Sequence, residues 1–196
     1  MDYAIRLDSR VCQVLLFVAI LQMYIIGPSK AMAETAIYVS DMPWQSEING
    51  WGPAERDRSN GERGEADGNP ITLNGVVYAK GIGAHANSEI LLNLNGEFER
   101  FSSMVGLDDE NNPNGSVVFE VYGDGQLLFQ SGVHYSDSAT EAVDVSVLGL
   151  NTLRLVIADG GNGIGSDHGD WADAILVRKE AVYVSDLPWL SETNGW

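Results

Sequence analysis

Residues Gly115 to Gln130 read GSVVFEVYGDGQLLFQ, and this stretch decides the class of fold. Val117, Phe119 and Val121 lie two residues apart, so in a strand they would share one face. Asp124-Gly125 is a dipeptide typical of the two-residue turn of a β-hairpin. We therefore expect two antiparallel strands joined at Asp124 and Gly125.

Short apolar segments bounded by Gly, Asn and Asp recur on both sides of this hairpin. They read ITLNGVVYAKG, SEILLNLNG, FERFSSMVGL, AVDVSVLGL, NTLRLVIA and ADAILV. None of them keeps an apolar stripe of helical period over three turns. About eight short strands with two-faced patterning predict an all-β domain, a β-sandwich of jelly-roll type.

A fourteen-residue phrase occurs twice. Residues 38–51 read YVSDMPWQSEINGW, residues 183–196 read YVSDLPWLSETNGW, and eleven positions are identical. The offset is 145 residues, a typical length for one domain. We expect one complete module over residues 34–180 and the start of a second, truncated copy over residues 181–196. The alternative is a single domain whose two ends share a motif by accident.

The first 33 residues have the pattern of a signal peptide. Arg6 and Arg10 precede an uncharged run from Val11 to Gly27, and Ala31-Met32-Ala33 places small residues where a signal peptidase cleaves. The alternative is an uncleaved membrane anchor, because the run approaches the roughly 20 apolar residues that span a bilayer. Cleavage predicts a secreted, periplasmic or cell-surface protein without a membrane segment in its mature form.

Charge and cysteine content narrow the class of function. The one cysteine, Cys12, lies in the predicted signal peptide, so the mature chain has no disulfide. The formal net charge is −17, and it becomes −18 when residues 1–33 with their two acids and three bases are removed. Such a surface repels phosphate backbones and anionic lipids, which argues against nucleic acid and membrane binding. Neutral ligands and cations remain suitable partners.

Two irregular stretches interrupt the strand pattern. Residues 50–70 read GWGPAERDRSNGERGEADGNP, and residues 158–174 read ADGGNGIGSDHGDWADA. Long polar loops that contain aromatic residues are where β-sandwiches place their binding sites. We expect the binding residues of the module to come mainly from these stretches.

The chain resembles the NPCBM/NEW2 domain, family 51 of the carbohydrate-binding modules. The resemblance is carried by YVSDMPW, NGWGPAERDRSNGE, LNGVVYAKGIGAHANSE, FSSMVGLDDE, GSVVFEVYGDGQLLFQSGV and GSDHGDWADAIL, in this order, between Ile37 and Arg178. It implies a galactose-binding-like jelly roll that holds one structural calcium ion, binds galactose-containing glycans and is fused to glycoside hydrolases or other surface proteins. Asn87 departs from the pattern, since the family commonly has proline there.

A sugar offers an apolar ring face and a fan of hydroxyl groups, so its site needs an aromatic platform with polar groups around it. The residues with suitable chemistry are Trp51, Arg56, His85, Asp167, His168 and Trp171. We expect Trp51 or Trp171 to be the platform and the others to be polar contacts. The alternatives are core packing for the two tryptophans and a structural role for His85.

Calcium prefers six to eight oxygen ligands in bent, oxygen-rich loops. The resemblance implies the ion but does not identify its ligands. Asp41, Asp170 and Asp173 are our candidates, because the two ends of a jelly roll lie side by side. The alternative is that these carboxylates are solvated or accept hydrogen bonds from turn amides.

Catalysis has no good candidates. Asp108, Asp109 and Glu110 are consecutive, and neighbours in a strand point to opposite faces, which makes a poor pair of acids for glycoside hydrolysis. Motifs for a serine nucleophile or a zinc site do not occur. We therefore predict a non-catalytic module for terminal galactose. The alternatives are the targeting module of a truncated secreted glycoside hydrolase, or a surface sandwich that binds protein and not sugar.

Overall fold

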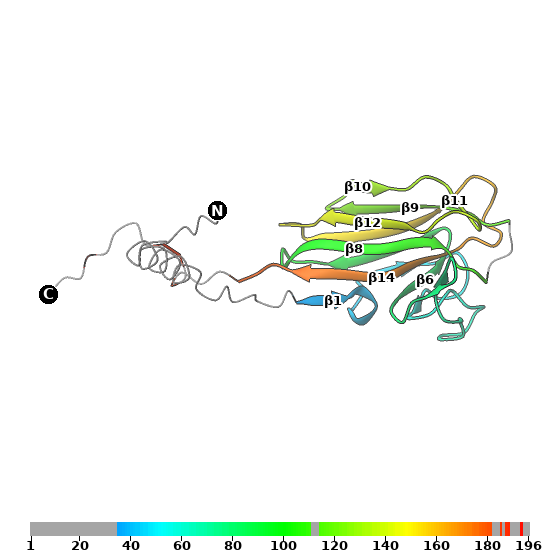
Figure 1. Cartoon of the computed structure of the whole chain (residues 1–196), viewed down its shortest axis with the longest axis horizontal. Coiled ribbons are helices and arrows are strands. Elements are labelled where there is room, and N and C mark those ends of the chain that lie inside the picture. Colours follow the sequence, from blue (N-terminus) through cyan, green and yellow to red (C-terminus); the bar gives the residue numbers. More distant parts are fainter. Residues whose placement is uncertain (1–34, 111–113, 182–184, 186, 189–192, 194–196) are drawn as a thin grey trace, which may run out of the picture. The chain divides into compact units, whose positions relative to one another are not determined.

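Two antiparallel β-sheets pack face to face in the computed structural model of the chain (Figure 1). The structure describes residues 35–110, 114–181, 185, 187, 188 and 193. The predicted signal peptide lies outside these residues, and so does most of the second phrase. Over the described part, no helix has the length and apolar character needed to cross a membrane.

The first sheet has the strand order β12-β8-β14-β6-β3, and β1 pairs with β14 beyond the end of β6. Its strands are β1 (Ala36–Tyr38), β3 (Glu55–Arg56), β6 (Gly81–His85), β8 (Phe98–Leu107), β12 (Glu141–Ser146) and β14 (His168–Arg178). A 3-10 turn, η1 (Val39–Asp41), leads from β1 toward the second sheet.

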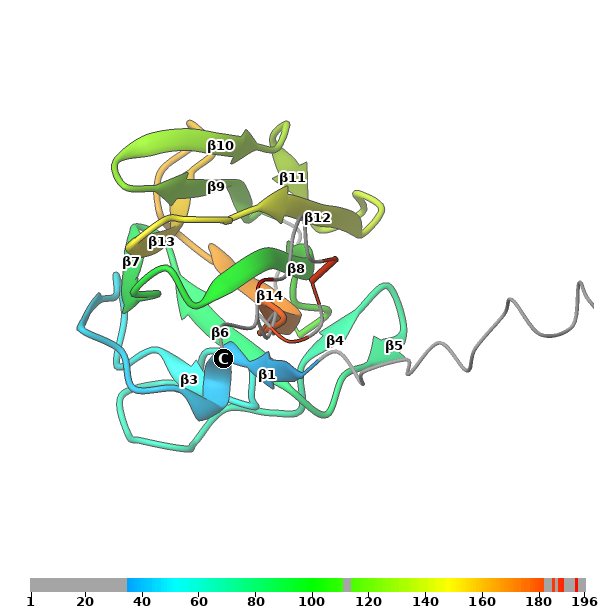
Figure 2. The same ribbon diagram turned by 90° about the vertical axis from the view of Figure 1, so that its left-hand side faces the viewer.

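The second sheet has the order β10-β9-β13-β7-β2, with β11 also paired to β9. Its strands are β2 (Ser46–Ile48), β7 (Ser88–Asn93), β9 (Ser116–Gly123), β10 (Gln126–Gln130), β11 (His134–Tyr135) and β13 (Thr152–Asp159). A small hairpin of β4 (Thr72–Leu73) and β5 (Val76–Val77) stands to one side of the sandwich (Figure 2).

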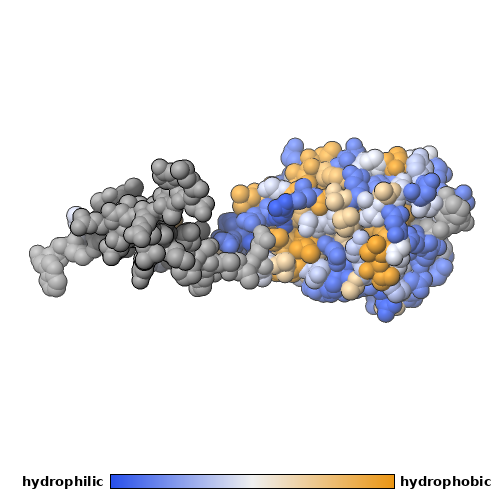
Figure 3. Space-filling model, in the orientation of Figure 1, coloured by the Kyte–Doolittle hydropathy of each residue, from blue (hydrophilic) through white to orange (hydrophobic). Residues whose placement is uncertain are grey.

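The core forms where the alternating faces of the two sheets meet. Val117, Phe119 and Val121 of β9 are fully buried, as their spacing predicts. The ring of Phe119 meets the edge of Trp171, with 5.2 Å between the ring centres. Each such side chain contributes roughly 1.5–3 kcal/mol through burial. On the outer face, apolar and hydrophilic residues are interspersed (Figure 3).

The predicted hairpin is confirmed. β9 and β10 are antiparallel partners, and Asp124 and Gly125 both have positive φ angles, 46° and 81°. Two positive φ angles are what the tightest hairpin turn requires, and Asp and Gly tolerate them. The all-β sandwich predicted from the strand pattern is likewise confirmed.

The sandwich has two different ends. At the termini end, the chain enters at Thr35 and leaves at Arg178, whose backbone N–H donates to the Thr35 carbonyl at 3.1 Å. At the loop end lie the segments after β6, after β8 and before β14 (Figure 1). The two irregular stretches of the sequence meet at the loop end, where the ring of His168 donates to the Asn60 carbonyl at 3.0 Å. His168 also opens β14 opposite His85 at the end of β6.

Candidate functional site

A hollow of about 400 Å³ opens at the loop end. Its walls carry carboxylates, amides and one imidazole: Asn60, Gly61, Glu62, Asp67, Gly68, Asn69, Glu110, Ser166 and His168. These groups offer hydrogen-bond donors and acceptors side by side, which is the chemistry that a ring of hydroxyl groups requires. The hollow is therefore our candidate ligand site.

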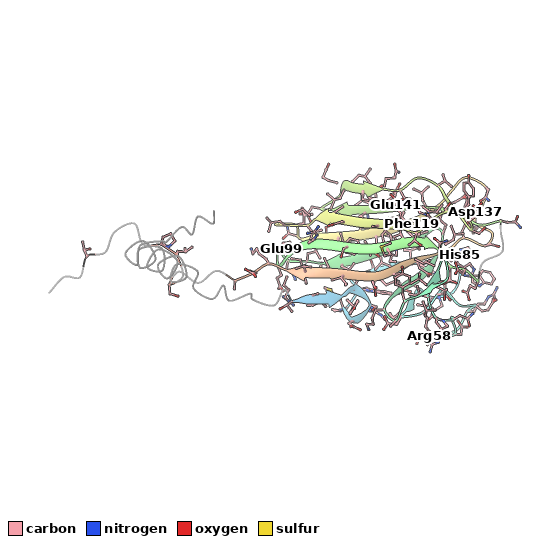
Figure 4. The ribbon with its side chains drawn as sticks, in the orientation of Figure 1. Arg58, His85, Glu99, Phe119, Asp137 and Glu141 are labelled. Atoms are coloured by element: carbon pink, nitrogen blue, oxygen red, sulfur yellow. The ribbon has the colours of Figure 1, made fainter. Side chains whose placement is uncertain are left out.

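Two histidines from neighbouring strands stand beside each other at this site. His85 and His168 are register partners of β6 and β14, and their rings meet edge to face with 5.0 Å between centres. Each ring donates through Nδ1 to a carbonyl oxygen, His85 to Ala86 at 2.6 Å and His168 to Asn60 at 3.0 Å. Figure 4 shows His85 at the loop end.

Burial lowers the pKa of His85, and the neighbouring His168 lowers it further. A neutral imidazole whose Nδ1 donates has an acceptor at Nε2. His85 is almost fully buried, with 6% of its surface exposed. It can therefore present at most an edge to a ligand, and it orients the ring of His168.

Asn49 connects three segments of this site through hydrogen bonds of its side chain. Its side-chain oxygen accepts from the backbone N–H of His85 at 2.8 Å, and its amide donates to the Asn60 side chain at 2.7 Å. The same amide donates to the carbonyl of Trp51 at 2.7 Å. Asn49 thus fixes one wall of the hollow relative to Trp51.

Trp51 remains a suitable platform. Trp51 has 39% of its surface exposed. The guanidinium of Arg63 lies over its ring, 4.6 Å from the ring centre. The guanidinium covers one face of the indole, which leaves the other face for stacking against a sugar ring.

Internal hydrogen bonds shape the loop that forms the outer wall. The Asp67 carboxylate accepts from the backbone N–H groups of Glu62 and Gly64, at 3.1 and 2.8 Å. Arg58 (Figure 4) donates to the Gly68 carbonyl at 2.9 Å. Across the hollow, Asn69 donates to the Glu110 carboxylate. Hydrogen bonds within the chain thus hold this wall in place.

Two predicted contact residues, Trp171 and Asp167, are buried behind the site and do not line the hollow. Trp171 has 1% of its surface exposed and packs between Phe101 and Phe119, so its ring faces cannot meet a sugar. Asp167 is fully buried and accepts from the Ser116 backbone N–H at 2.8 Å. Burial is the main reason that the pKa of Asp167 rises from 3.8 to about 6. Both side chains are buried and support the loops of the site by packing and hydrogen bonding.

Arg56 lies in a second hollow, of about 500 Å³, and is not among the residues that line the first. Its guanidinium stacks on Trp44 at 3.6 Å and donates to the backbone carbonyls of Ser40 and Met42. Burial lowers its pKa, against the opposing effect of nearby carboxylates. These contacts give Arg56 a structural role in holding residues 40–44.

The three predicted calcium ligands are not brought together. Asp41 forms an ion pair with Lys80 at 2.5 Å, and Lys80 also pairs with Asp57 at 2.7 Å. Asp170 is fully buried, and burial together with the charge of Asp108 raises its pKa well above 3.8. Within the described ranges, no three acidic, histidine or cysteine side chains are grouped as metal ligands. Calcium also takes backbone carbonyl oxygens as ligands, so the assignment of Asp41, Asp170 and Asp173 stays a prediction.

Sequence reasoning missed Asn49, Asn60, Asn69 and Glu110. Asn49 lies in the repeated phrase, a signal that could have identified it. Asn60 and Asn69 lie in the irregular stretch 50–70, and Glu110 is the last of three consecutive acids, but their residue types alone did not single them out as contacts. Asn87, the departure from the family pattern, accepts from the Asp159 backbone N–H through its side chain at 2.9 Å, a bond that proline could not make.

The fold and the hollow together define a class of protein, namely β-sandwich modules that have a small polar ligand site in their loops. The NPCBM/NEW2 domain matches residues 35–177, and the chain therefore belongs to the NPCBM/NEW2 family. The resemblance seen in the sequence is thereby confirmed.

Two solved structures are similar. The CBM51 module of Clostridium perfringens GH95, determined with methyl-galactose, is 43% identical with a TM-score of 0.66, covering 72% of this chain and 99% of that one. The CBM51-2 and INT domains of Clostridium perfringens ZmpB are 33% identical with a TM-score of 0.67, covering 74% of this chain and 32% of theirs.

A curated relative from Renibacterium salmoninarum, named as an endo-alpha-N-acetylgalactosaminidase, is 38% identical over 161 residues. The alpha-1,3-galactosidase B of Akkermansia muciniphila is 35% identical over 107 residues. The alignments cover 76% and 53% of this chain but only 11% and 13% of those proteins. The chain thus spans about a tenth of the length of the curated relatives that it matches.

Proposed function

We propose that this chain is a non-catalytic module that binds a terminal galactose-type sugar in the hollow at the loop end. The observation that carries the proposal is the edge-to-face pair of His85 and His168 at the hollow, which Asn49 links to the backbone of the partly exposed Trp51. The relative that is 43% identical was determined in complex with methyl-galactose.

The chemistry of the hollow suits galactose. The axial hydroxyl of galactose leaves one ring face apolar enough to stack on an indole such as Trp51. The remaining hydroxyls need donors and acceptors, which His168, Glu110 and the neighbouring asparagine amides supply. Each neutral contact contributes about 1 kcal/mol net, so we expect a dissociation constant in the micromolar to millimolar range.

Two of the three consecutive acids have structural partners, which suits a non-catalytic role. Asp108 accepts from the backbone N–H groups of Thr72 and Glu110, both at 2.9 Å. Asp109 accepts from those of Asn74 and Gly75, at 2.9 and 2.7 Å. These carboxylates hold the β4–β5 hairpin and do not flank an open cleft, as the paired acids of a glycosidase must.

For the whole protein, we propose an exported chain in which this jelly-roll module directs neighbouring modules to glycans. The signal-peptide pattern of residues 1–33 and the second phrase at residues 181–196 support export and a tandem arrangement. Tandem modules raise avidity for clustered sugars that each module binds weakly. One structural calcium ion stays part of the proposal, without assigned ligands.

Galactose titration by calorimetry on residues 34–196 tests the site. We expect binding by the wild-type chain and at least a tenfold loss in His168→Ala. His134→Ala is the matched control, because His134 packs on Phe119 and bonds to Glu141 outside the hollow. Equal galactose binding by the folded His168 variant would place the site elsewhere. An array on which the chain binds no sugar but retains a surface protein would favour the protein-binding alternative.

A further inference from the structure

The first phrase of the sequence fills a groove in the sandwich. We call residues 36–51 the opening segment. Its strand β1 pairs with β14, with Ala36 opposite Val177, while η1 contacts β14 and β6, and β2 pairs with β7. Val39, between β1 and β2, is completely buried in the core. Without an occupant, the groove between β14, β6 and β7 would expose that part of the core to water.

A few side chains hold the opening segment in this groove. Asp41 pairs with Lys80, and the Trp44 ring lies under Arg56 while its Nε1 donates to the Val39 carbonyl at 3.1 Å. Glu47 accepts from the Ala54 backbone N–H at 3.3 Å. Asn49 makes the bonds to His85 and Asn60 described above. A segment that occupies this groove therefore needs the same side chains at these positions.

Residues 181–196 carry the same side chains at these positions. The residues equivalent to Val39, Asp41, Trp44, Glu47 and Asn49 are identical: Val184, Asp186, Trp189, Glu192 and Asn194. Over the aligned residues 36–51 and 181–196, the two copies differ at Ile37, Met42, Gln45 and Ile48. Gln45 and Ile48 are exposed, while Ile37 and Met42 are replaced by the apolar residues Val182 and Leu187. Residues 181–196 thus keep the residue types that make the contacts of the opening segment.

The second phrase is also tethered within reach. Ala181, the equivalent of Ala36, follows Val177 after only three residues, 178–180. Partners across an antiparallel pair lie roughly 4.5–5.5 Å apart, and three-residue connections between such strands are common. The chain connects the opening segment to the rest of the domain at Gly52, and it connects the second phrase to β14 at Arg178. Both therefore have a high effective concentration at the groove.

We infer that the groove between β14, β6 and β7 accepts residues 181–196 of the same chain in place of residues 36–51. The exchange would bring Asn194 and Trp196 to the positions of Asn49 and Trp51 beside the candidate sugar site. In a tandem protein, the same property would let adjacent modules share their opening strands. The inference depends on the contacts of the groove and not on the proposed sugar.

Thermal unfolding of residues 34–196 tests the inference with matched substitutions in the two copies. Val39→Asp places a carboxylate at a fully buried position and excludes the opening segment from the core. We expect Val39→Asp alone to lower the unfolding midpoint by no more than roughly 5 °C, and Val184→Asp alone to leave it unchanged. The double variant should have no cooperative unfolding transition above room temperature.

Two further measurements identify the occupant. In Val39→Asp, limited proteolysis with mass spectrometry should show cleavage within residues 34–51, while the second phrase becomes protected. Size-exclusion chromatography should show a monomer. If Val39→Asp alone unfolds the chain as fully as the double variant, the inference is wrong. Rescue that occurs only in a dimer would also overturn it, because the chain's own segment would not then be the occupant.

Discussion

The two ends of the sandwich each have a hollow, of about 430 Å³ at the termini end and about 400 Å³ at the loop end. At the termini end, Glu99 (Figure 4), Arg100, Asp144, Ser146 and Leu148 form the walls. Arg100 and Asp144 form a two-pronged ion pair there, and both side chains are more than half exposed. The charges of Arg100 and Asp144 at this end are thus paired with each other and exposed to water.

The loop end contrasts in how its polar groups are buried. Oδ2 of Asp167 is buried and has no hydrogen-bond partner among the described residues. Asp170 is buried next to Asp108, and burial together with that neighbouring carboxyl group raises its pKa. His85, also buried, has a lowered pKa. Groups held in costly environments cluster where a protein works, whereas exposed ion pairs contribute little. Chemistry, and not the size of the hollow, therefore distinguishes the candidate site.

The largest expected effect concerns the two tryptophans of the loop end. Trp171→Ala would remove a fully buried ring that packs on Phe101 and Phe119. We expect the free energy of unfolding to fall by about 3–5 kcal/mol. The matched control, Trp51→Ala, removes a ring that is 39% exposed, so the free energy of unfolding should fall clearly less than in Trp171→Ala.

Urea unfolding of both variants measures this difference. Equal losses in the two variants would mean that Trp51 belongs to the core, and the contrast between a supporting and a displayed tryptophan would disappear. A small loss in Trp171→Ala would restore this residue as a candidate platform for the sugar.

Most of the fold could be predicted from the sequence, because its signals are local. The spacing of Val117, Phe119 and Val121 identifies a buried strand face. The Asp124-Gly125 turn needs only its own two positive φ angles. The order of strands in each sheet could not be predicted in the same way, because it depends on which distant segments pair.

The site was predicted only in part, for a reason visible in β14. The sequence reading treated residues 158–174 as one irregular stretch, but β14 begins at His168. Trp171 lies three positions after His168, an odd number that places the two side chains on opposite faces of a regular strand. His168 therefore reaches the hollow, while Trp171 enters the core. The pairing of His85 with His168 depends on the β6–β14 register, which the sequence does not state.

A smaller effect concerns the pH dependence of stability. The pKa of Asp167 is about 6 in the folded chain against 3.8 as its ordinary value, so the folded state binds this proton more tightly than the unfolded state does. The contribution of Asp167 to stability is thus fully present below about pH 4 and is lost as the pH rises through 6. Relative to Asp167→Asn, the wild-type chain should gain stability as the pH falls from 7 to 4.

Urea midpoints of the two chains across this range give the difference directly. His85 acts in the opposite direction, since its lowered pKa removes stability on acidification, but it is present in both chains and cancels. Parallel pH profiles for the wild-type chain and Asp167→Asn would mean that the Asp167 carboxyl group is solvated.

The smallest effect is expected at the termini end, and it is the sharpest check on the contrast between the two ends. Arg100→Ala would remove the partner of Asp144, yet both side chains are exposed to water, which already solvates and screens the two charges. We expect neither the thermal midpoint nor galactose binding to change measurably, in low or in moderate salt. A clear loss of galactose affinity in this variant would give the termini end a functional role, and buried polar chemistry would no longer distinguish the binding end from the other.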